Sequence, residues 1–169
     1  MRSLIDIREL NVDEIDELVR VANDIIDNPA KCSEKCKGKI LATLFFEPST
    51  RTRLSFESAM LNLGGNVIGF SDSQNSSASK GESVADTTKI VSGYADIIAM
   101  RHPKEGAPLV ASMNTDIPVI NAGDGGRAYP VKTLADISTV WMEKNHISNM
   151  KIGFVGDFSN NTLVRGLLQ

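Results

Sequence analysis

The sequence contains few cysteines, no long apolar run and no strong excess of charge, and each absence excludes a class of protein. Cys32 and Cys36 are the two cysteines, and their spacing would place both on one face of a helix. A structural zinc site needs about four ligands, whereas the two histidines, His102 and His146, are far away in the sequence. We therefore expect two unbridged thiols and no metal.

Membrane and nucleic-acid partners are not indicated either. No segment approaches the roughly 20 apolar residues of a membrane span, and acidic residues interrupt the N-terminus where a secretory signal would be apolar. The net charge of −3 gives no bulk attraction for nucleic acid or for an anionic membrane. We expect a cytoplasmic protein with neither as partner.

Length and periodicity predict the architecture. At 169 residues, with 41% apolar and 23% charged residues, the chain has room for one domain with a real core, or for one domain and the beginning of a second. A predicted helix begins at the N-cap pair Asn11 and Glu14 and ends near Asn28. Apolar runs at 39–46, 66–70, 96–100 and 117–121 then alternate with helical patterns that end near 63 or cover 83–94 and 105–113. This alternation predicts an α/β fold, a parallel sheet with helices on both faces, which binds ligands at the carboxyl ends of its strands.

The last part of the chain has the pattern of a second domain. Residues 133–144 are predicted to form a helix, residues 151–155 a new strand, and residues from 161 the first turn of another helix. We therefore divide the chain into a first domain over residues 1–132, a connecting helix and linker over 133–149, and the start of a second α/β domain over 150–169.

The segment FFEPSTRTRLSFE, residues 45–57, contains the strongest candidate site. It places Ser49, Thr50, Arg51 and Thr52 where a buried strand ends and a helix begins. Such a junction exposes unpaired backbone N–H groups at the positive end of the helix dipole, and an arginine adds a planar fork of donors that matches phosphate oxygens. A simple helix cap beside a surface arginine is the alternative, but one cap needs only one hydroxyl. We therefore predict an anion site.

A long polar segment, residues 71–81, interrupts the alternating pattern. Loops of this length in a compact domain are usually functional or mobile, although a solvated linker would have the same composition. A third pattern, Gly123-x-Gly125-x-x-Ala128, nominally fits a dinucleotide-binding turn. Pro130 crowds the place where the phosphate-binding helix would start, and the preceding strand is not the first of its unit, so this interpretation is disfavoured.

The residues resemble a known family. Residues 45–52, FFEPSTRT, resemble the signature F-x-[EK]-x-S-[GT]-R-T of the aspartate and ornithine carbamoyltransferases, and Glu47 at its third position is typical of the aspartate branch. The resemblance continues, in the family's order, through GFSD at 69–72, SKGES at 79–83, ADT at 85–87, RHP at 101–103, EGA at 105–107 and NAGDG at 121–125. It implies the carbamoyltransferase fold, with residues 1–132 as the carbamoyl-phosphate domain and residues from 150 as the start of the amino-acid domain.

The resemblance also implies a reaction. A carbamoyl group would pass from carbamoyl phosphate to the amino group of L-aspartate, giving N-carbamoyl-L-aspartate and phosphate, a step of pyrimidine biosynthesis. No metal or organic cofactor would be needed, because this chemistry needs preorganised donors and cations rather than a protein nucleophile.

Family roles follow for the matched residues. The resemblance implies that Ser49, Thr50, Arg51 and Thr52 hold the phosphate, and that Arg101 contacts the carbonyl oxygen with help from Thr52. The family's active sites lie between the subunits of a trimer. Lys80 and a preceding serine, Ser77 with Ser76 and Ser79 as alternatives, would therefore reach the site of a neighbouring subunit. Some relatives also have regulatory chains, so a regulatory partner is possible here.

The sequence departs from the family pattern in two places. Where the family has His-Pro-Thr-Gln, the sequence has Tyr129-Pro130-Val131-Lys132. A tyrosine hydroxyl can still donate a hydrogen bond, but a lysine ammonium cannot accept one. Thr162 stands where the aspartate branch places an arginine, so ornithine or another amine is an alternative acceptor. A catalytically weak homologue that assembles with active chains is the hypothesis from a different class.

Three further residues have simpler interpretations. His102 follows Arg101 at a strand end, where it would cap a turn. The family implies that Glu47 pairs with a basic residue of the second domain. Arg53 is expected to be a structural ion-pair partner, since its neighbour Arg51 matches the anion-binding position.

Overall fold

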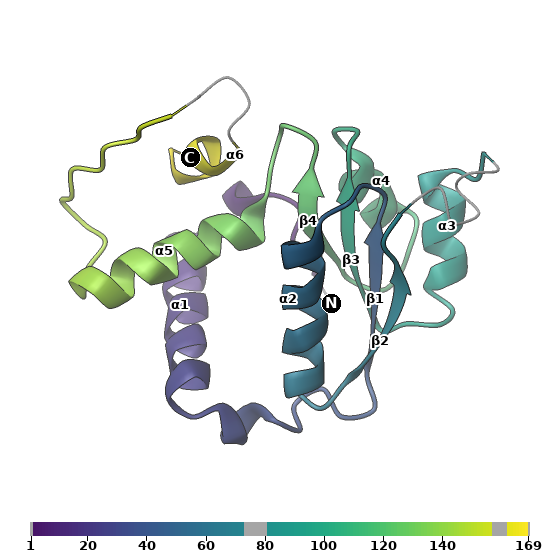
Figure 1. The fold of residues 1–169 in the computed structure, drawn as a ribbon, viewed down its shortest axis with the longest axis horizontal. Coiled ribbons are helices and arrows are strands. Elements are labelled where there is room, and N and C mark those ends of the chain that lie inside the picture. The colour runs from purple at the N-terminus through teal and green to yellow at the C-terminus, as the bar shows by residue number, and fades with distance from the viewer. Residues whose placement is uncertain (1, 73–80, 157–161, 169) are drawn as a thin grey trace.

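The computed structural model describes residues 2–72, 81–156 and 162–168 and has the predicted α/β fold. Four parallel strands form one sheet in the order β2-β1-β3-β4 (Figure 1). The strands are β1 (Ile40–Phe45), β2 (Asn66–Phe70), β3 (Ile97–His102) and β4 (Val119–Asp124). Each lies within about two or three residues of its predicted range. For β1, β3 and β4 this follows because their apolar residues are largely buried.

Helices cover both faces of the sheet, as predicted. Alternate residues of a strand point to opposite faces. On one face Leu44 and Met100 pack with Ala111 of α4 (Ala107–Met113), and Val84 and Val91 of α3 (Val84–Val91) adjoin this cluster. On the other face Leu41 packs with Met60 of α2 (Thr50–Asn62).

The N-terminal part of the chain forms its predicted helix. This helix, α1 (Val12–Asp27), begins at a capping box in which Asn11 and Glu14 satisfy each other's backbone N–H groups. A short 3-10 turn, η1 (Ile7–Glu9), precedes it. Leu4 pairs with Ile120 in an isolated parallel bridge, where Leu4 N donates to Val119 O at 2.9 Å and Asn121 N donates to Leu4 O at 2.9 Å. The N-terminal segment therefore covers the outer edge of β4.

The C-terminal part differs from the prediction in two ways. The helix α5 (Pro130–Lys144) begins three residues before the predicted start at 133, because Pro130 occupies its first turn, where no N–H is required. Residues 151–155, which were predicted to be a strand, pair with no other strand in the part of the chain that the structure describes, and Val155 is fully exposed. A strand needs a neighbour to satisfy its backbone groups, and here residues 151–155 have none among the described residues. The helix α6 (Thr162–Leu167) is present where a helix was predicted.

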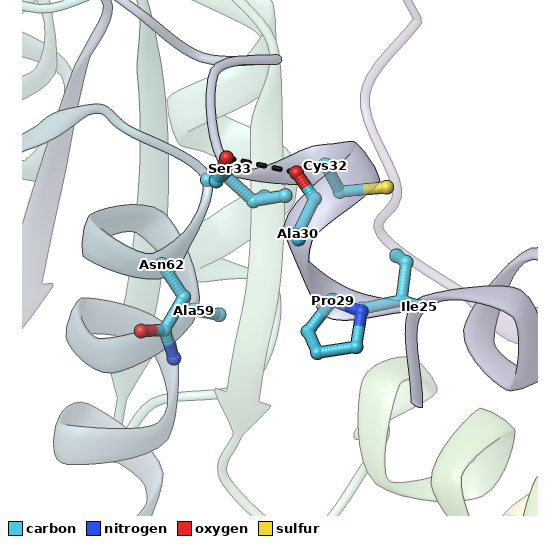
Figure 2. A pocket seen from close by; sticks show the side chains of 8 residues that line it. Ile25, Pro29, Ala30, Cys32, Ser33, Ala59 and Asn62 are labelled. Carbon is cyan, nitrogen blue, oxygen red and sulfur yellow. Dashed lines mark hydrogen bonds between the residues drawn. The ribbon is translucent and has the colours of Figure 1, made fainter. Parts of the chain in front are cut away.

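A cavity of about 570 Å³ lies at the amino ends of the strands, away from the candidate site. Figure 2 shows side chains from the end of α1 and the 3-10 turn η2 (Pro29–Cys32) facing the last turns of α2. Cys32 is buried there and, like Cys36, is a free thiol. Within the described residues, no helix is long and apolar enough to cross a membrane.

Candidate active site

The predicted junction between a strand and a helix is present at the carboxyl end of β1. β1 ends at Phe45 and α2 begins at Thr50, with Ser49 as its N-cap residue. The Ser49 side chain makes no capping hydrogen bond, so its hydroxyl is not committed to the helix. The structure therefore does not support the simpler interpretation, in which the Ser49 hydroxyl caps the helix by a hydrogen bond.

Two arginines of the first turns of α2 have different environments. Arg51 is exposed. Arg53 instead donates from Nε to Glu57 Oε1 at 2.6 Å, and the buried Thr43 hydroxyl donates to the same oxygen at 2.9 Å. Arg53 is therefore the structural ion-pair partner that the sequence predicted.

A cavity of about 490 Å³ opens beside this junction. Its walls come from the end of β1, from α2 and from the chain that follows β2. It is lined by Phe45, Pro48, Ser49, Thr50, Arg53, Leu54, Glu57, Ser71 and Asp72. Hydroxyl groups and an arginine thus lie together with two carboxylates, which makes the cavity polar but not purely cationic.

Arg101 lies at the carboxyl end of β3, the strand next to β1. Its Nε is 2.7 Å from Glu47 Oε1, and its Nη1 donates to Ala122 O at 3.3 Å. Gly123 has a φ of +136°, and a Cβ added there would lie 2.7 Å from Arg101 Nη1. The arginine therefore lies between the chain that follows β1 and the end of β4, and the positive φ of Gly123 favours glycine there.

Glu47 has a different partner from the one that the family resemblance implied. It was expected to pair with a basic residue of the second domain, and among the described residues it pairs with Arg101. The two side chains are about equally exposed, at 25% and 29%. A carboxylate next to the candidate substrate-binding arginine lowers the local positive potential.

Tyr129 brings the loop after β4 into contact with the start of α2. Its hydroxyl donates to Thr52 Oγ1 at 3.0 Å, and Arg101 Cζ lies 5.9 Å from the centre of its ring. Thr52, Arg101 and Tyr129, three of the residues singled out from the sequence, are therefore brought together from α2, β3 and the β4–α5 loop.

The other candidate residues are not joined to this cluster by a described contact. Lys132, in the first turn of α5, forms an ion pair with Asp136 one turn along the same helix. Ser77 and Lys80, with the alternatives Ser76 and Ser79, lie outside the described residues. Thr162 begins α6.

His102, next to Arg101, has the simpler role that the sequence indicated. Its Nδ1 accepts a hydrogen bond from Lys104 N at 2.9 Å, which closes a turn, and its ring lies 4.8 Å from that of Phe46. Burial lowers the pKa of His102 below its ordinary value of 6.5, since the charged imidazolium loses hydration.

Sequence reasoning assigned no role to Asp124, at the end of β4. This carboxylate is fully buried and accepts a hydrogen bond from Gly106 N at 2.6 Å. Burial raises the pKa of Asp124 above its ordinary value, because desolvation disfavours the charged form. A charged residue at the end of a buried strand was the signal that could have identified it. Within the described part of the chain, no group of three His, Cys, Asp or Glu side chains could hold a metal ion.

Comparison with known proteins identifies the class. The family model of the aspartate/ornithine carbamoyltransferase carbamoyl-P binding domain matches residues 2–142. The chain therefore belongs to the aspartate/ornithine carbamoyltransferase family, as the motifs predicted.

Within this family, the similar proteins belong to the aspartate branch. The chain is 56% identical over 168 residues to the aspartate carbamoyltransferase catalytic subunits of Clostridium kluyveri and Clostridium acetobutylicum, covering 99% of this chain and 55% of each relative. It matches the catalytic subunit of M. jannaschii aspartate transcarbamoylase with a TM-score of 0.92 and 46% identity, over 99% of this chain and 56% of that one. It also matches the Trypanosoma cruzi enzyme in complex with carbamoyl phosphate and aspartate, with a TM-score of 0.92 and 32% identity, over 99% and 56%. The chain spans about half the length of the curated relatives that it matches.

Proposed function

We propose that this chain is the carbamoyl-phosphate-binding part of an aspartate carbamoyltransferase. The complete enzyme transfers the carbamoyl group of carbamoyl phosphate to the amino group of L-aspartate, a step in pyrimidine biosynthesis. The observation that carries the proposal is the cluster of Thr52, Arg101 and Tyr129 beside the start of α2, in a chain that is 56% identical to aspartate carbamoyltransferase catalytic subunits.

The phosphate side of the site would be built on the first turn of α2. Ser49, Thr50, Arg51 and Thr52 bind the phosphate through hydroxyls, guanidinium and backbone N–H groups. Two observations support this assignment. The Ser49 hydroxyl makes no capping hydrogen bond to α2, and Arg51 is exposed. The helix dipole adds to the attraction for a multiply charged anion.

The carbonyl side would be built from two donors, Arg101 and Thr52, and from Tyr129, which is hydrogen-bonded to Thr52. During attack by the amine, negative charge grows on the carbonyl oxygen, and phosphate then leaves as an anion. Arg101 and Thr52 stabilise this charge, and no protein nucleophile is required. Tyr129 acts through Thr52, because its single O–H donates to Thr52 Oγ1. Lys132 lies one turn further along α5, and its ion pair with Asp136 offsets its charge. Its role in this assignment is therefore to shape the site rather than to accept a hydrogen bond from the carbamoyl group.

The amine acceptor is proposed from the relatives. Solved structures of the Trypanosoma cruzi enzyme contain aspartate together with carbamoyl phosphate. Most of the acceptor site belongs to the second domain, which we place from residue 150 onward, after the connecting helix and linker of 133–149. Thr162 stands at the family's arginine position, so ornithine remains the acceptor to compare with aspartate.

The assembly would supply the rest of the site. We propose a cytoplasmic homotrimer in which Lys80 and Ser77 of one subunit enter the active site of its neighbour. A regulatory chain is a further possible partner of such a trimer.

Calorimetric titration with carbamoyl phosphate tests the proposal. The oligomeric state of the chain is measured first, and inorganic phosphate serves as competitor. We expect binding that phosphate competes away and that the Arg51→Ala variant loses. Absence of binding at millimolar ligand, in a folded and trimeric chain, would contradict the proposal.

A catalytically weak homologue is the second candidate, and Tyr129 and Lys132 favour it. Loss of one oxyanion donor typically slows catalysis by about 10² to 10³. The double variant Tyr129→His, Lys132→Gln restores the family residues. If it binds carbamoyl phosphate much more tightly than the unchanged chain, the two natural residues weaken the site. If affinity falls, they belong to a working site.

A further inference from the structure

The loop between β4 and α5 contains an arginine, Arg127, that lies between two buried carboxylates. Arg127 Nη2 is 3.9 Å from Asp6 Oδ2, and Nη1 is 3.7 Å from Asp124 Oδ2. The side chains of Asp6 and Asp124 are only 9% and 1% exposed. One cation therefore connects the N-terminal segment with the end of β4.

The two carboxylates depend on Arg127 to different degrees. Asp6 accepts two hydrogen bonds from the Arg8 side chain, at 3.0 and 2.7 Å. Asp124 Oδ1 accepts from Gly106 N, but its Oδ2 is buried and accepts no hydrogen bond within the described part of the chain. A buried carboxylate without a counter-charge is costly, so Arg127 is the cation that offsets Asp124.

The loop that contains Arg127 is short and leads directly to Tyr129. Asp124 N donates to Ala128 O at 3.1 Å, and Arg127 N donates to Asp124 O at 2.9 Å. Asn121 Nδ2 donates to Ala128 O at 3.4 Å. The next residue is Tyr129, so the position of its hydroxyl against Thr52 follows from the path of this loop.

We propose that Arg127 is a positioning residue of the active site. By binding Asp6 and Asp124 it fixes the β4–α5 loop, and the loop places the Tyr129 hydroxyl against Thr52. The inference rests on the proposed function in that Thr52 binds carbamoyl phosphate, but the positioning itself is measurable without ligand.

The ligand-free test uses the two tyrosines, Tyr94 and Tyr129, labelled with 3-fluorotyrosine and observed by fluorine NMR. We expect Arg127→Gln to shift the Tyr129 signal and to leave that of the exposed Tyr94 unchanged, with recovery in Arg127→Lys. Arg8→Gln is the matched control, because Arg8 binds the same Asp6 but does not contact Asp124 in the described contacts. An unchanged Tyr129 signal in folded Arg127→Gln would overturn the proposal.

A second variant keeps the proposal testable if Arg127→Gln does not fold. Asp6→Asn removes one of the two carboxylates that Arg127 binds while preserving the shape of the side chain. If Arg127→Gln does not fold, Asp6→Asn should still shift the Tyr129 signal, and the absence of that shift would overturn the proposal.

The binding test is a double-mutant cycle with carbamoyl phosphate. We expect Arg127→Gln to raise the Kd about three- to tenfold, as loss of one hydrogen bond would. In the Tyr129→Phe background the same change should have little effect, because the hydroxyl that it positions is already absent. Equal weakening in both backgrounds would show that Arg127 does not act through Tyr129.

The two tests separate this inference from the proposed function. A shifted Tyr129 signal in a chain that binds no carbamoyl phosphate would retain the positioning role and reject the binding function. Ligand binding with no effect of Arg127→Gln on either Kd or spectrum would retain the function and reject the positioning role.

Discussion

The hydroxyl of Tyr129 donates a hydrogen bond to Thr52 Oγ1 at 3.0 Å, although 77 residues separate the two in the sequence. Thr52 lies in the first turn of α2, and Tyr129 immediately precedes α5. The hydrogen bond therefore joins the starts of two helices that follow β1 and β4, the strands on either side of β3.

Removal of the Tyr129 hydroxyl should lower the free energy of unfolding measurably. Tyr129→Phe keeps the ring beside Arg101 but leaves Thr52 without its donor. We expect the free energy of unfolding to fall by about 1 kcal/mol, the usual net value of one hydrogen bond. Urea denaturation measures this change, and Tyr94→Phe, at a side chain that is 66% exposed, should change it little.

Substitutions of Arg51 and Arg53 should have separate effects, one on ligand binding and the other on the stability of the fold. Arg53→Ala removes an ion pair from Glu57, which also binds the buried Thr43, so we expect a loss of about 1 to 2 kcal/mol in unfolding free energy. Arg51→Ala should change stability by less than about 0.5 kcal/mol, as expected for an exposed side chain, but should abolish binding of carbamoyl phosphate. Thermal unfolding and calorimetry on both variants measure the two effects, and a reversed pattern would contradict the assignment.

Glu47→Gln should strengthen anion binding. The change removes a negative charge 2.7 Å from Arg101 Nε and leaves the guanidinium available to substrate. We expect affinity for inorganic phosphate to rise a few fold, because one unit charge at short range in water contributes on the order of 1 kcal/mol. The gain should shrink at high salt, and Glu34→Gln, which alters an exposed ion pair with Lys37, should show none of it.

Gly123→Ala should disturb Arg101. A Cβ at this position would lie 2.7 Å from Arg101 Nη1, and the φ of +136° is unfavourable for alanine. We expect a destabilisation of about 1 to 3 kcal/mol together with weaker phosphate binding. The control is Gly153→Ala, where the added Cβ meets no atom within 4 Å. A stable variant with unchanged binding would show that Arg101 tolerates displacement.

His102 should make stability depend on pH. Burial lowers its pKa in the folded state, so the unfolded state takes up the proton first as pH falls below 6.5. The free energy of unfolding therefore falls until the pH reaches the folded-state pKa. Burial raises the pKa of Asp124, which makes the folded state more stable as pH falls and so opposes the effect of His102. The contribution of His102 is therefore measured by comparison with a His102 variant. His102→Asn, which keeps an acceptor for Lys104 N, should lose less stability between pH 7 and pH 5.

The strands and helices of the first domain could be predicted because their signals are local. Buried apolar runs define β1 and β3, and Asn11 with Glu14 defines the start of α1. The strand predicted at residues 151–155 failed because a strand depends on a neighbouring strand as well as on its own pattern. The start of α5 was predicted too late because Pro130 was interpreted as an obstacle to a helix, whereas proline is favoured in a first turn.

Candidate site residues could be predicted from the motifs, but their contacts could not. The ion pairs between Glu47 and Arg101 and between Asp6 and Arg127 join residues that are far apart in the sequence. No periodicity or spacing reports such contacts. They depend on which strand ends lie next to one another, and this becomes known only with the order β2-β1-β3-β4.

The pairing of the N-terminal segment with β4 has a consequence for synthesis on the ribosome. Asn121 Nδ2 donates a hydrogen bond to Ile5 O, and 116 residues separate the two in the sequence. At roughly 5 to 20 residues per second, residues 3–6 would wait about 6 to 23 s for these partners to be translated. Nascent chains arrested before residue 119 should therefore leave residues 3–6 open to proteases. Residues 3–6 can therefore dock only after β4 has been translated.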